Sequence, residues 1–249
     1  GVAALSAALN DVLAAPFADA VETLRAARGK VIVSGVGKSG HIARKIASTL
    51  ASTGTPAFFV HPSEASHGDL GMVTTDDAII ALSWSGESAE LRSLVEYSRR
   101  FRIPMIAITA APDSPLAREC DVVLALPRAT EACPHGLAPT TSTLMQLALG
   151  DALAIALLES RGFTAEEFRV LHPGGRLGAN LHFVRDIMHR GDAVPVVTPD
   201  TAMSEAIVRI SSGSFGCVGV VDAGGRLVGV VTDGDLRRHM APDLLSRLV

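Results

Sequence analysis

The sequence predicts an α/β protein in which a five-stranded parallel sheet is flanked by helices on both faces and followed by a small α+β unit. Five short apolar runs alternate with segments whose apolar residues recur at helical spacing, a pattern typical of a buried parallel sheet. Beyond about residue 181 the order changes to strand, helix, two strands joined by a glycine turn, and helix. We therefore expect two domains, residues 1–180 and 181–249.

Each element follows from its own pattern. Residues 5–27 carry a helical apolar stripe that Pro16 interrupts, which predicts two helical pieces. A long helix over residues 140–159 is apolar on nearly every side, so it belongs in a core or a subunit interface. The strands are expected at residues 31–33, 57–60, 77–82, 105–109 and 122–126 of the first domain, and at residues 194–197, 217–221 and 227–231 of the second.

The turn after the first strand has the character of a phosphate-binding loop. Residues 31–40 read Val-Ile-Val-Ser-Gly-Val-Gly-Lys-Ser-Gly, which predicts a strand, a glycine loop and a helix start. Glycines let backbone amides approach an anion, and the free N–H groups of a helix start carry partial positive charge. The candidate phosphate ligands are Ser34, Gly37, Lys38 and Ser39.

The sequence of this loop partly matches two nucleotide-binding motifs, but it lacks a residue that each motif requires. A Walker A loop would need glycine where the chain has Ile32. The glycines at 35, 37 and 40 match the dinucleotide fingerprint, but the next strand ends in residues 61–62, His-Pro, rather than in the acid that holds a ribose. A nicotinamide enzyme is therefore disfavoured.

A second loop of the same kind follows the third strand. Ser83, Ser85 and Ser88 lie around Trp84 and Gly86 where a helix begins, so their hydroxyls could bind a phosphate or could merely cap the helix. Because parallel strands end at the same edge of a sheet, the two loops together would suit one sugar phosphate.

The composition disfavours several classes of partner. The net charge is −4, with one Trp, eight Phe and no basic stripe, which makes nucleic acid a poor candidate. The three cysteines lack Cys-x-x-Cys spacing and suit a reducing cytoplasm. No membrane span is expected, because the longest uncharged run, residues 132–150, carries two prolines and four consecutive hydroxyl residues. The start at Gly1 lacks the basic lead of a signal peptide, and a trimmed start is expected.

Seven blocks of sequence stand in order along the chain, at residues 35–40, 51–62, 67–72, 131–134, 137–140, 150–154 and 172–175. Together they resemble one known family, the sugar-isomerase (SIS) domain proteins. Within that family the chain is most similar to the group that interconverts D-ribulose 5-phosphate and D-arabinose 5-phosphate. Residues 232–238 resemble the closing signature of a CBS module.

The resemblance implies an aldose–ketose isomerase that works through an enediol or enediolate and supplies Kdo for lipopolysaccharide or capsule. It also implies a flavodoxin-like, three-layer SIS domain, a homotetramer, and a small sugar phosphate as ligand, with no required cofactor. The positions that match the family's catalytic residues are Lys38, Glu90, Glu131 and His172. The positions that match its sugar site are Gly54, Thr55, His61 and His67.

Several features of the resemblance leave alternatives open. Trp84 stands where the family usually has asparagine, which could narrow the pocket or alter affinity. The family usually has two CBS modules, whereas one is recognisable here, so an adenosine nucleotide near Thr232 and Asp235 is uncertain. His61 is a possible contact of a divalent metal, but no histidine pair has zinc-protease spacing, so a required metal is not expected.

Moving a carbonyl between C1 and C2 requires a base that takes a proton from one carbon and returns it to its neighbour. A carboxylate whose pKa is raised toward neutrality in a partly dry pocket would suit this task. We favour Glu131, in a proline-rich loop, over Glu90, which lies one helical turn beyond the serine loop. Lys38 would stabilise the enediolate or hold the phosphate, and His172 would shuttle protons or open a cyclic substrate.

Two other functions share these motifs. A sugar-phosphate sensor would bind the same ligand without catalysis, but such regulators usually carry a basic helix-turn-helix segment, which we do not find in the sequence. A different SIS enzyme, such as a phosphoheptose isomerase, would not be expected to carry the CBS tail.

Overall fold

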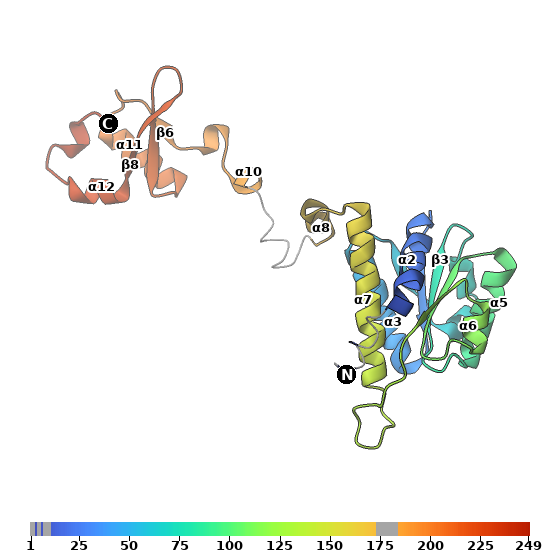
Figure 1. Cartoon of the computed structure of the whole chain (residues 1–249). Coiled ribbons are helices and arrows are strands. Elements are labelled where there is room, and N and C mark those ends of the chain that lie inside the picture. The colour runs from blue at the N-terminus through green and yellow to red at the C-terminus, as the bar shows by residue number, and fades with distance from the viewer. Residues whose placement is uncertain (1–2, 4–5, 7–10, 173–183) are drawn as a thin grey trace. The chain divides into compact units, whose positions relative to one another are not determined.

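The computed structural model of the chain describes residues 3, 6, 11–172 and 184–249. The chain divides into two compact units, Gly1–Leu181 and His182–Val249 (Figure 1). The glycine-rich block predicted at residues 173–178 lies outside the described residues.

The first unit is built on a five-stranded parallel sheet, as the sequence predicts. The strand order is β2-β1-β3-β4-β5, so β1 lies between β2 and β3. In register, Val31 of β1 pairs with Ala57 of β2 and with Ala78 of β3. The strands are β1 (Val31–Gly35), β2 (Ala57–Phe59), β3 (Ala78–Leu82), β4 (Met105–Thr109) and β5 (Val122–Ala125).

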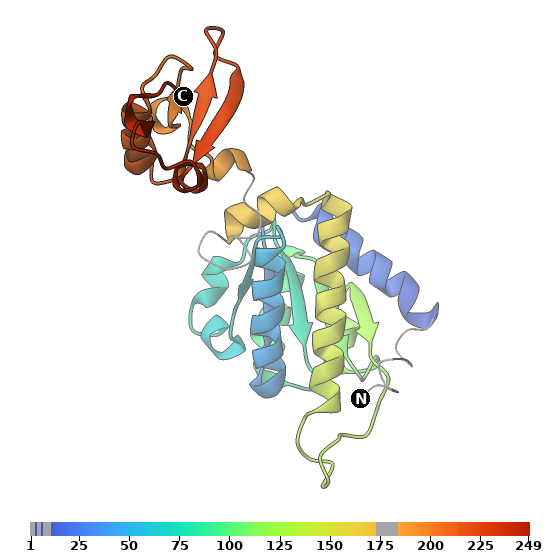
Figure 2. The ribbon, with the colours of Figure 1, turned by 90° about the vertical axis from the view of Figure 1, so that its left-hand side faces the viewer.

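Helices cover both faces of this sheet and make three layers (Figures 1 and 2). Successive strand residues point to opposite faces, so Val31 and Val33 enter one apolar cluster and Ile32 enters the other. The first cluster packs under α2 (Asp11–Ala26), α3 (Gly37–Ser52) and α7 (Thr141–Arg161). The second packs under α4 (Pro62–Ala65), α5 (Arg92–Phe101) and α6 (Pro115–Glu119). The short elements of this unit are the 3₁₀ turns η1 (Asp69–Met72) and η2 (Ala89–Leu91) and the helix α8 (Ala165–Leu171).

The prediction of two helical pieces around Pro16 is wrong. A single helix, α2, runs through Pro16 without ending there. Proline removes one helical hydrogen bond and strains the preceding turn, but Leu13 and Phe17 pack against the core on the same stripe as buried Ala20 and Leu24. Continuous burial of that stripe outweighs the local cost.

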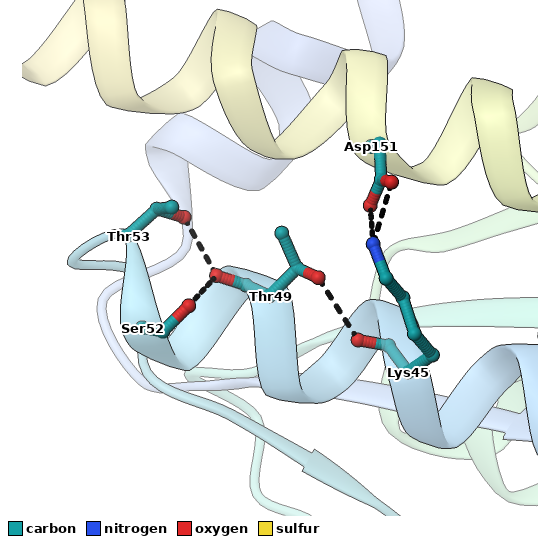
Figure 3. A network of polar contacts seen from close by, with 5 residues as sticks. All are labelled: Lys45, Thr49, Ser52, Thr53 and Asp151. Carbon is teal, nitrogen blue, oxygen red and sulfur yellow. Dashed lines mark hydrogen bonds and ion pairs between the residues drawn. The ribbon is translucent and has the colours of Figure 1, made fainter. Parts of the chain in front are cut away.

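The helices α3 and α7 lie side by side on one face of the sheet, and both begin at the same edge (Figure 2). Gly150 of α7 allows this close approach, because a Cβ there would lie 2.3 Å from Cδ1 of Ile46. Lys45, the residue before Ile46, forms an ion pair with Asp151, the residue after Gly150 (Figure 3). By composition α7 is apolar and long enough to cross a membrane, yet half of its most apolar window is buried inside this unit.

The second unit has the strand–helix–strand–strand–helix order that the sequence predicts. Its sheet order is β6-β7-β8, with β6 and β7 parallel and β7 and β8 antiparallel. Its apolar cluster includes Val197, Ala206, Ile210 and Val218. Its elements are α10 (Val184–Ile187), η3 (Gly191–Ala193), β6 (Val196–Val197), α11 (Met203–Gly213), β7 (Cys217–Val221), β8 (Leu227–Thr232), α12 (Asp233–Arg238) and η4 (Leu244–Ser246).

The close contact at Gly150 yields a test of the α3–α7 interface. Alanine in place of glycine stabilises an open helical position by about 1 kcal/mol, but here the new methyl group would displace Ile46. We expect Gly150→Ala to lower the free energy of unfolding by about 1–3 kcal/mol in urea denaturation. The penalty should be smaller in an Ile46→Ala background, and a stabilising Gly150→Ala would contradict the packing described.

Candidate active site

The predicted loops meet at one open cavity at the carboxyl edge of the sheet. Because β1 and β3 are neighbours, the loops that follow them lie side by side. The cavity measures about 470 Å³. A larger cavity of about 710 Å³ lies along α5 and α6, and of the predicted residues it includes only Ser88. The smaller cavity is lined by Val36, Lys38, Ser39, Leu82, Ser83, Trp84, Ser85, Ser88, Glu131, Gly136, Leu137, Pro139, Ser142 and Thr143.

The first loop presents the start of α3 to the cavity. The N-cap residue, Val36, makes no side-chain capping bond, so the first N–H groups of α3 have no partner within the helix. Gly37 adopts φ +58°, and Gly40 packs so tightly that a Cβ would lie 2.6 Å from the Gly35 carbonyl oxygen. This tight turn places Lys38 and Ser39 on the first turn of α3, beside amides that suit an anion.

The second loop contributes three hydroxyl groups. Ser83 Oγ lies 2.9 Å from Ser88 Oγ and accepts a hydrogen bond from the Gly86 amide at 3.0 Å. Ser85 Oγ accepts from the Glu87 amide at 3.3 Å. When the Ser83 hydroxyl donates its proton to Ser88, the Ser88 hydroxyl can donate its own proton to a ligand. The loop can therefore donate hydroxyl hydrogen bonds to an anion.

Glu131 enters the cavity as the cap of α7, a role that the sequence analysis missed. Its Oε2 accepts hydrogen bonds from the Thr140 amide at 2.7 Å, the Thr140 hydroxyl at 3.1 Å and the Ser142 amide at 3.3 Å. The run of hydroxyl residues at 140–143 was the available signal for a helix start in need of a cap.

The expectation that the pKa of Glu131 is raised toward neutrality is wrong. Burial raises the pKa, but hydrogen bonds from the Ser142 side chain and from the Thr140 and Ser142 amides outweigh burial. Together they lower the pKa of Glu131 to about 2. The carboxylate is therefore ionised across the physiological range, and it is the only carboxylate among the described residues that line this cavity.

Three predicted residues lie near the cavity without lining it, and one of them, Gly37, stands between the lining residues Val36 and Lys38. Ser34 is fully buried and donates its hydroxyl proton to the Val60 carbonyl at 2.7 Å, so it joins β1 to the end of β2. Glu90 is exposed on η2, two residues beyond Ser88.

His61 and His67 follow β2 at the same edge of the sheet, outside the residues that line the cavity. Nδ1 of His61 accepts from the Ser63 amide at 3.2 Å, which caps α4. Nδ1 of His67 lies 2.7 Å from the Ser63 carbonyl oxygen. The described part of the chain contains no group of three His, Cys, Asp or Glu side chains that could hold a metal.

Three predicted residues lie at the opposite edge of the sheet. Gly54 and Thr55 follow the far end of α3, whose 16 residues span about 24 Å. Gly54 adopts φ +89°, and a Cβ there would lie 2.4 Å from the Phe163 ring. His172 ends α8, which follows the far end of α7 (Figure 1), and its ring stacks on Phe168 at 3.9 Å. Within one chain these residues do not meet Lys38 and Glu131.

In the second unit, Thr232 and Asp235 bond to each other. Together they form the capping box of α12, in which the Thr232 hydroxyl donates to Asp235 Oδ2 at 2.7 Å and accepts from the Asp235 amide at 3.2 Å. Asp235 also pairs with Arg238. Any ligand of these two residues would have to compete with the helix cap.

Comparison with known proteins identifies both units. A family model described as the SIS domain matches residues 23–156, and one described as the CBS domain matches residues 184–242. Arabinose 5-phosphate isomerase KdsD of Shigella flexneri is 51% identical over 233 residues, which cover 93% of this chain and 71% of the relative. The Pseudomonas aeruginosa KdsD is 53% identical over 225 residues, which cover 90% of this chain and 69% of the relative.

Solved structures show the same fold for the first unit. An Escherichia coli CFT073 protein in complex with arabinose 5-phosphate has a TM-score of 0.66 and 44% identity, covering 69% of this chain and 91% of that one. A Bacteroides fragilis protein described as a putative phosphosugar isomerase involved in capsule formation has a TM-score of 0.65 and 40% identity, covering 69% of this chain and 93% of that one.

The capping role of Glu131 predicts a pH-dependent contribution to stability. The pKa of Glu131 in the folded chain lies below its ordinary value of 4.5, so the contribution is complete above about pH 4.5 and is lost as pH falls toward 2. We expect Glu131→Gln to lower the free energy of unfolding by about 1 kcal/mol at pH 7. In urea denaturation the difference from wild type should shrink below about pH 4.5.

Glu159 provides a matched control, because it is exposed in the last turn of the same helix. A carboxylate near a helix C-terminus gains nothing from the helix dipole, so Glu159→Gln should be neutral or slightly stabilising. A difference between Glu131→Gln and wild type that does not change with pH would contradict the capping role.

Proposed function

This chain belongs to the family of SIS-domain arabinose 5-phosphate isomerases that carry a CBS domain, and we propose that it interconverts D-ribulose 5-phosphate and D-arabinose 5-phosphate. The observation that carries the proposal is the single cavity that joins the β1 and β3 loops to one carboxylate, Glu131, and one ammonium group, Lys38. This arrangement supplies an anion site and a proton acceptor within reach of one small ligand.

The phosphate group would bind between the two loops. The start of α3 offers the hydroxyl of Ser39 and amides that no described side chain caps, and the facing loop offers Ser83, Ser85 and Ser88. Hydrogen bonds to an ionised phosphate are stronger than those between neutral groups. The sugar carbons would then lie toward Glu131, at the start of α7.

Glu131 is our proposed base for the transfer of a proton between C1 and C2. Its low pKa makes it ionised but weakly basic, so proton abstraction depends on stabilising the negative charge that develops on the substrate oxygen. Lys38 is the cation in the cavity suited to that task. Glu90 is the second candidate base, placed near Ser88 but exposed in the free chain.

We infer that Gly54, Thr55 and His172 act in the site of another copy of this chain. They match the family's motif but lie at the opposite edge of the sheet from Lys38. A closed homotetramer would carry that edge to the cavity of a neighbouring subunit. In that position His172 would exchange protons between substrate oxygens or open a cyclic sugar.

We further propose a cytoplasmic role in supplying Kdo for lipopolysaccharide or capsule. Proton transfer between adjacent carbons needs no electron acceptor, so the reaction requires no redox cofactor. Lys38 supplies the positive charge that a metal would otherwise contribute. His61 and the nucleotide site at Thr232 and Asp235 would then be accessory.

The base assignment predicts a loss of proton exchange. In Glu131→Gln the cavity keeps its shape but loses its proton acceptor, so turnover should fall by about 10²–10⁴-fold. Deuterium incorporation at C2 of arabinose 5-phosphate in D₂O, followed by proton NMR, should fall in parallel. Glu90→Gln is the comparison variant. Near-normal exchange in Glu131→Gln, with loss in Glu90→Gln, would move the base to Glu90.

The shared site predicts complementation between two inactive variants. Lys38→Ala and His172→Ala, co-expressed with different tags, should form mixed oligomers in which about a quarter of the sites are intact. We therefore expect activity well above that of either variant alone. Lys38→Ala co-expressed with a Lys38→Ala/His172→Ala double variant is the control, because no intact site can form. Mixed oligomers as inactive as their parents would contradict a site shared between subunits.

A further inference from the structure

A buried amide lies behind the cavity and is in contact with one of its hydroxyl groups. Gln146 of α7 is fully buried. Its Oε1 accepts a hydrogen bond from Ser39 Oγ at 3.1 Å, whereas its Nε2 has no partner among the described residues. A buried amide N–H without a partner is rare and costly in folded proteins. This unpaired donor distinguishes Gln146 from an ordinary core residue.

The observed hydrogen bond directs the proton of Ser39 away from the cavity. A serine hydroxyl has one proton, and here Ser39 donates it to Gln146. A phosphate group at neutral pH presents acceptors, so Ser39 can bind it only through that same proton. A hydrogen bond from the Ser39 hydroxyl to a phosphate therefore requires Ser39 to stop donating to Gln146.

Rotation of the Gln146 amide by about 180° resolves this competition, because the amide carries a donor on one side and an acceptor on the other. After rotation, Nε2 donates to Ser39 Oγ, and the Ser39 proton is free to face the anion. The rotation leaves one N–H and the carbonyl oxygen without a partner, in place of two N–H groups, and an unpaired carbonyl oxygen is tolerated better than an unpaired N–H. Each bond in the chain from amide to hydroxyl to phosphate also polarises the next.

We propose that Gln146 is a positioning residue for the phosphate, and that its amide turns on binding so that Ser39 donates into the cavity. The proposal rests on the proposed function for the presence of a phosphate beside Ser39. The surrounding interface holds the pair together, since Gly150 packs on Ile46 and Lys45 pairs with Asp151 on the same two helices (Figure 3). Because this packing fixes the distance between the helices, Ser39 and Gln146 stay in contact while the amide rotates.

The test measures binding of inorganic phosphate to the full chain. Trp84 is the only tryptophan and lines the cavity, so its fluorescence reports occupancy, and isothermal calorimetry provides an independent dissociation constant. The variants are Gln146→Met, which keeps the size of the side chain without its polar atoms, Ser39→Ala, and the double variant. Gln146→Glu, which keeps an acceptor and removes the donor, is the second substitution at this position.

We expect Gln146→Met to raise the Kd for phosphate by roughly three- to tenfold. In the isomerase assay the same variant should raise KM with little change in kcat. In the Ser39→Ala background Gln146→Met should have no further effect, because Gln146 acts through Ser39. Gln146→Glu should weaken binding more than Gln146→Met does, and part of its effect should vanish with Ser39→Ala.

Thr141→Val is the matched control. Thr141 is buried on the same helix, its hydroxyl has no partner among the described residues, and it does not line the cavity, so the Kd should stay at the wild-type value. An unchanged or lower Kd for phosphate in Gln146→Met would overturn the role of Gln146. The same conclusion would follow if Gln146→Met raised the Kd equally in the wild-type and Ser39→Ala backgrounds. Neither result would contradict the phosphate site itself. Failure of the wild-type chain to bind phosphate in calorimetry would overturn the phosphate site as well.

Discussion

The neighbouring positions of β1 and β3 determine where this protein can bind a ligand. The strand order β2-β1-β3-β4-β5 places the two strands side by side although β2 lies between them in the chain. The connections from β1 and from β3 lead to opposite faces of the sheet, to α3 and to α5. At such a point the two connections diverge and leave a crevice at the strand ends. The cavity with Lys38, Ser39, Ser83 and Glu131 occupies this crevice.

The start of α7 imposes a second constraint on the chemistry. Glu131 satisfies amides that would otherwise lack partners, and the same hydrogen bonds make it a weak base. A carboxylate free of those bonds would be more basic but would leave the helix start uncapped. If Glu131 is the base, as we propose, catalysis would depend on a cation and helix amides that stabilise the intermediate, with the base acting mainly as an ionised acceptor.

The parallel sheet and the two loops after β1 and β3 could be predicted from the sequence. Continuous β-branched runs such as residues 31–33 and 105–109 have few alternatives to a buried parallel strand, and glycine and serine at their ends have clear physical reasons. The break predicted at Pro16 does not occur, because burial of the helix stripe compensates for the local strain of the proline and local sequence does not report that burial. The pKa of Glu131 was out of reach, because its donors are nine and eleven residues away along the chain and meet it only through a loop.

The positions of Gly54, Thr55 and His172 were out of reach for a different reason. A motif shared with a family identifies residues that work together, but it does not say whether one chain brings them together. That depends on the direction in which α3 and α7 run, and both carry the chain away from the cavity. Gln146 was missed because a lone glutamine in an apolar helix gives no sequence signal of the hydroxyl that it contacts.

The N-termini of the two parallel helices α3 and α7 are capped differently, and this difference affects which charged ligands the cavity accepts. Both α3 and α7 begin at the cavity, but the positive end of α7 is already neutralised by Glu131, whereas that of α3 is uncapped. The cavity thus has one cationic half and one anionic half. A ligand with a phosphate at one end and an uncharged sugar at the other matches this polarity, whereas a bisphosphate would bring its second anion against a carboxylate.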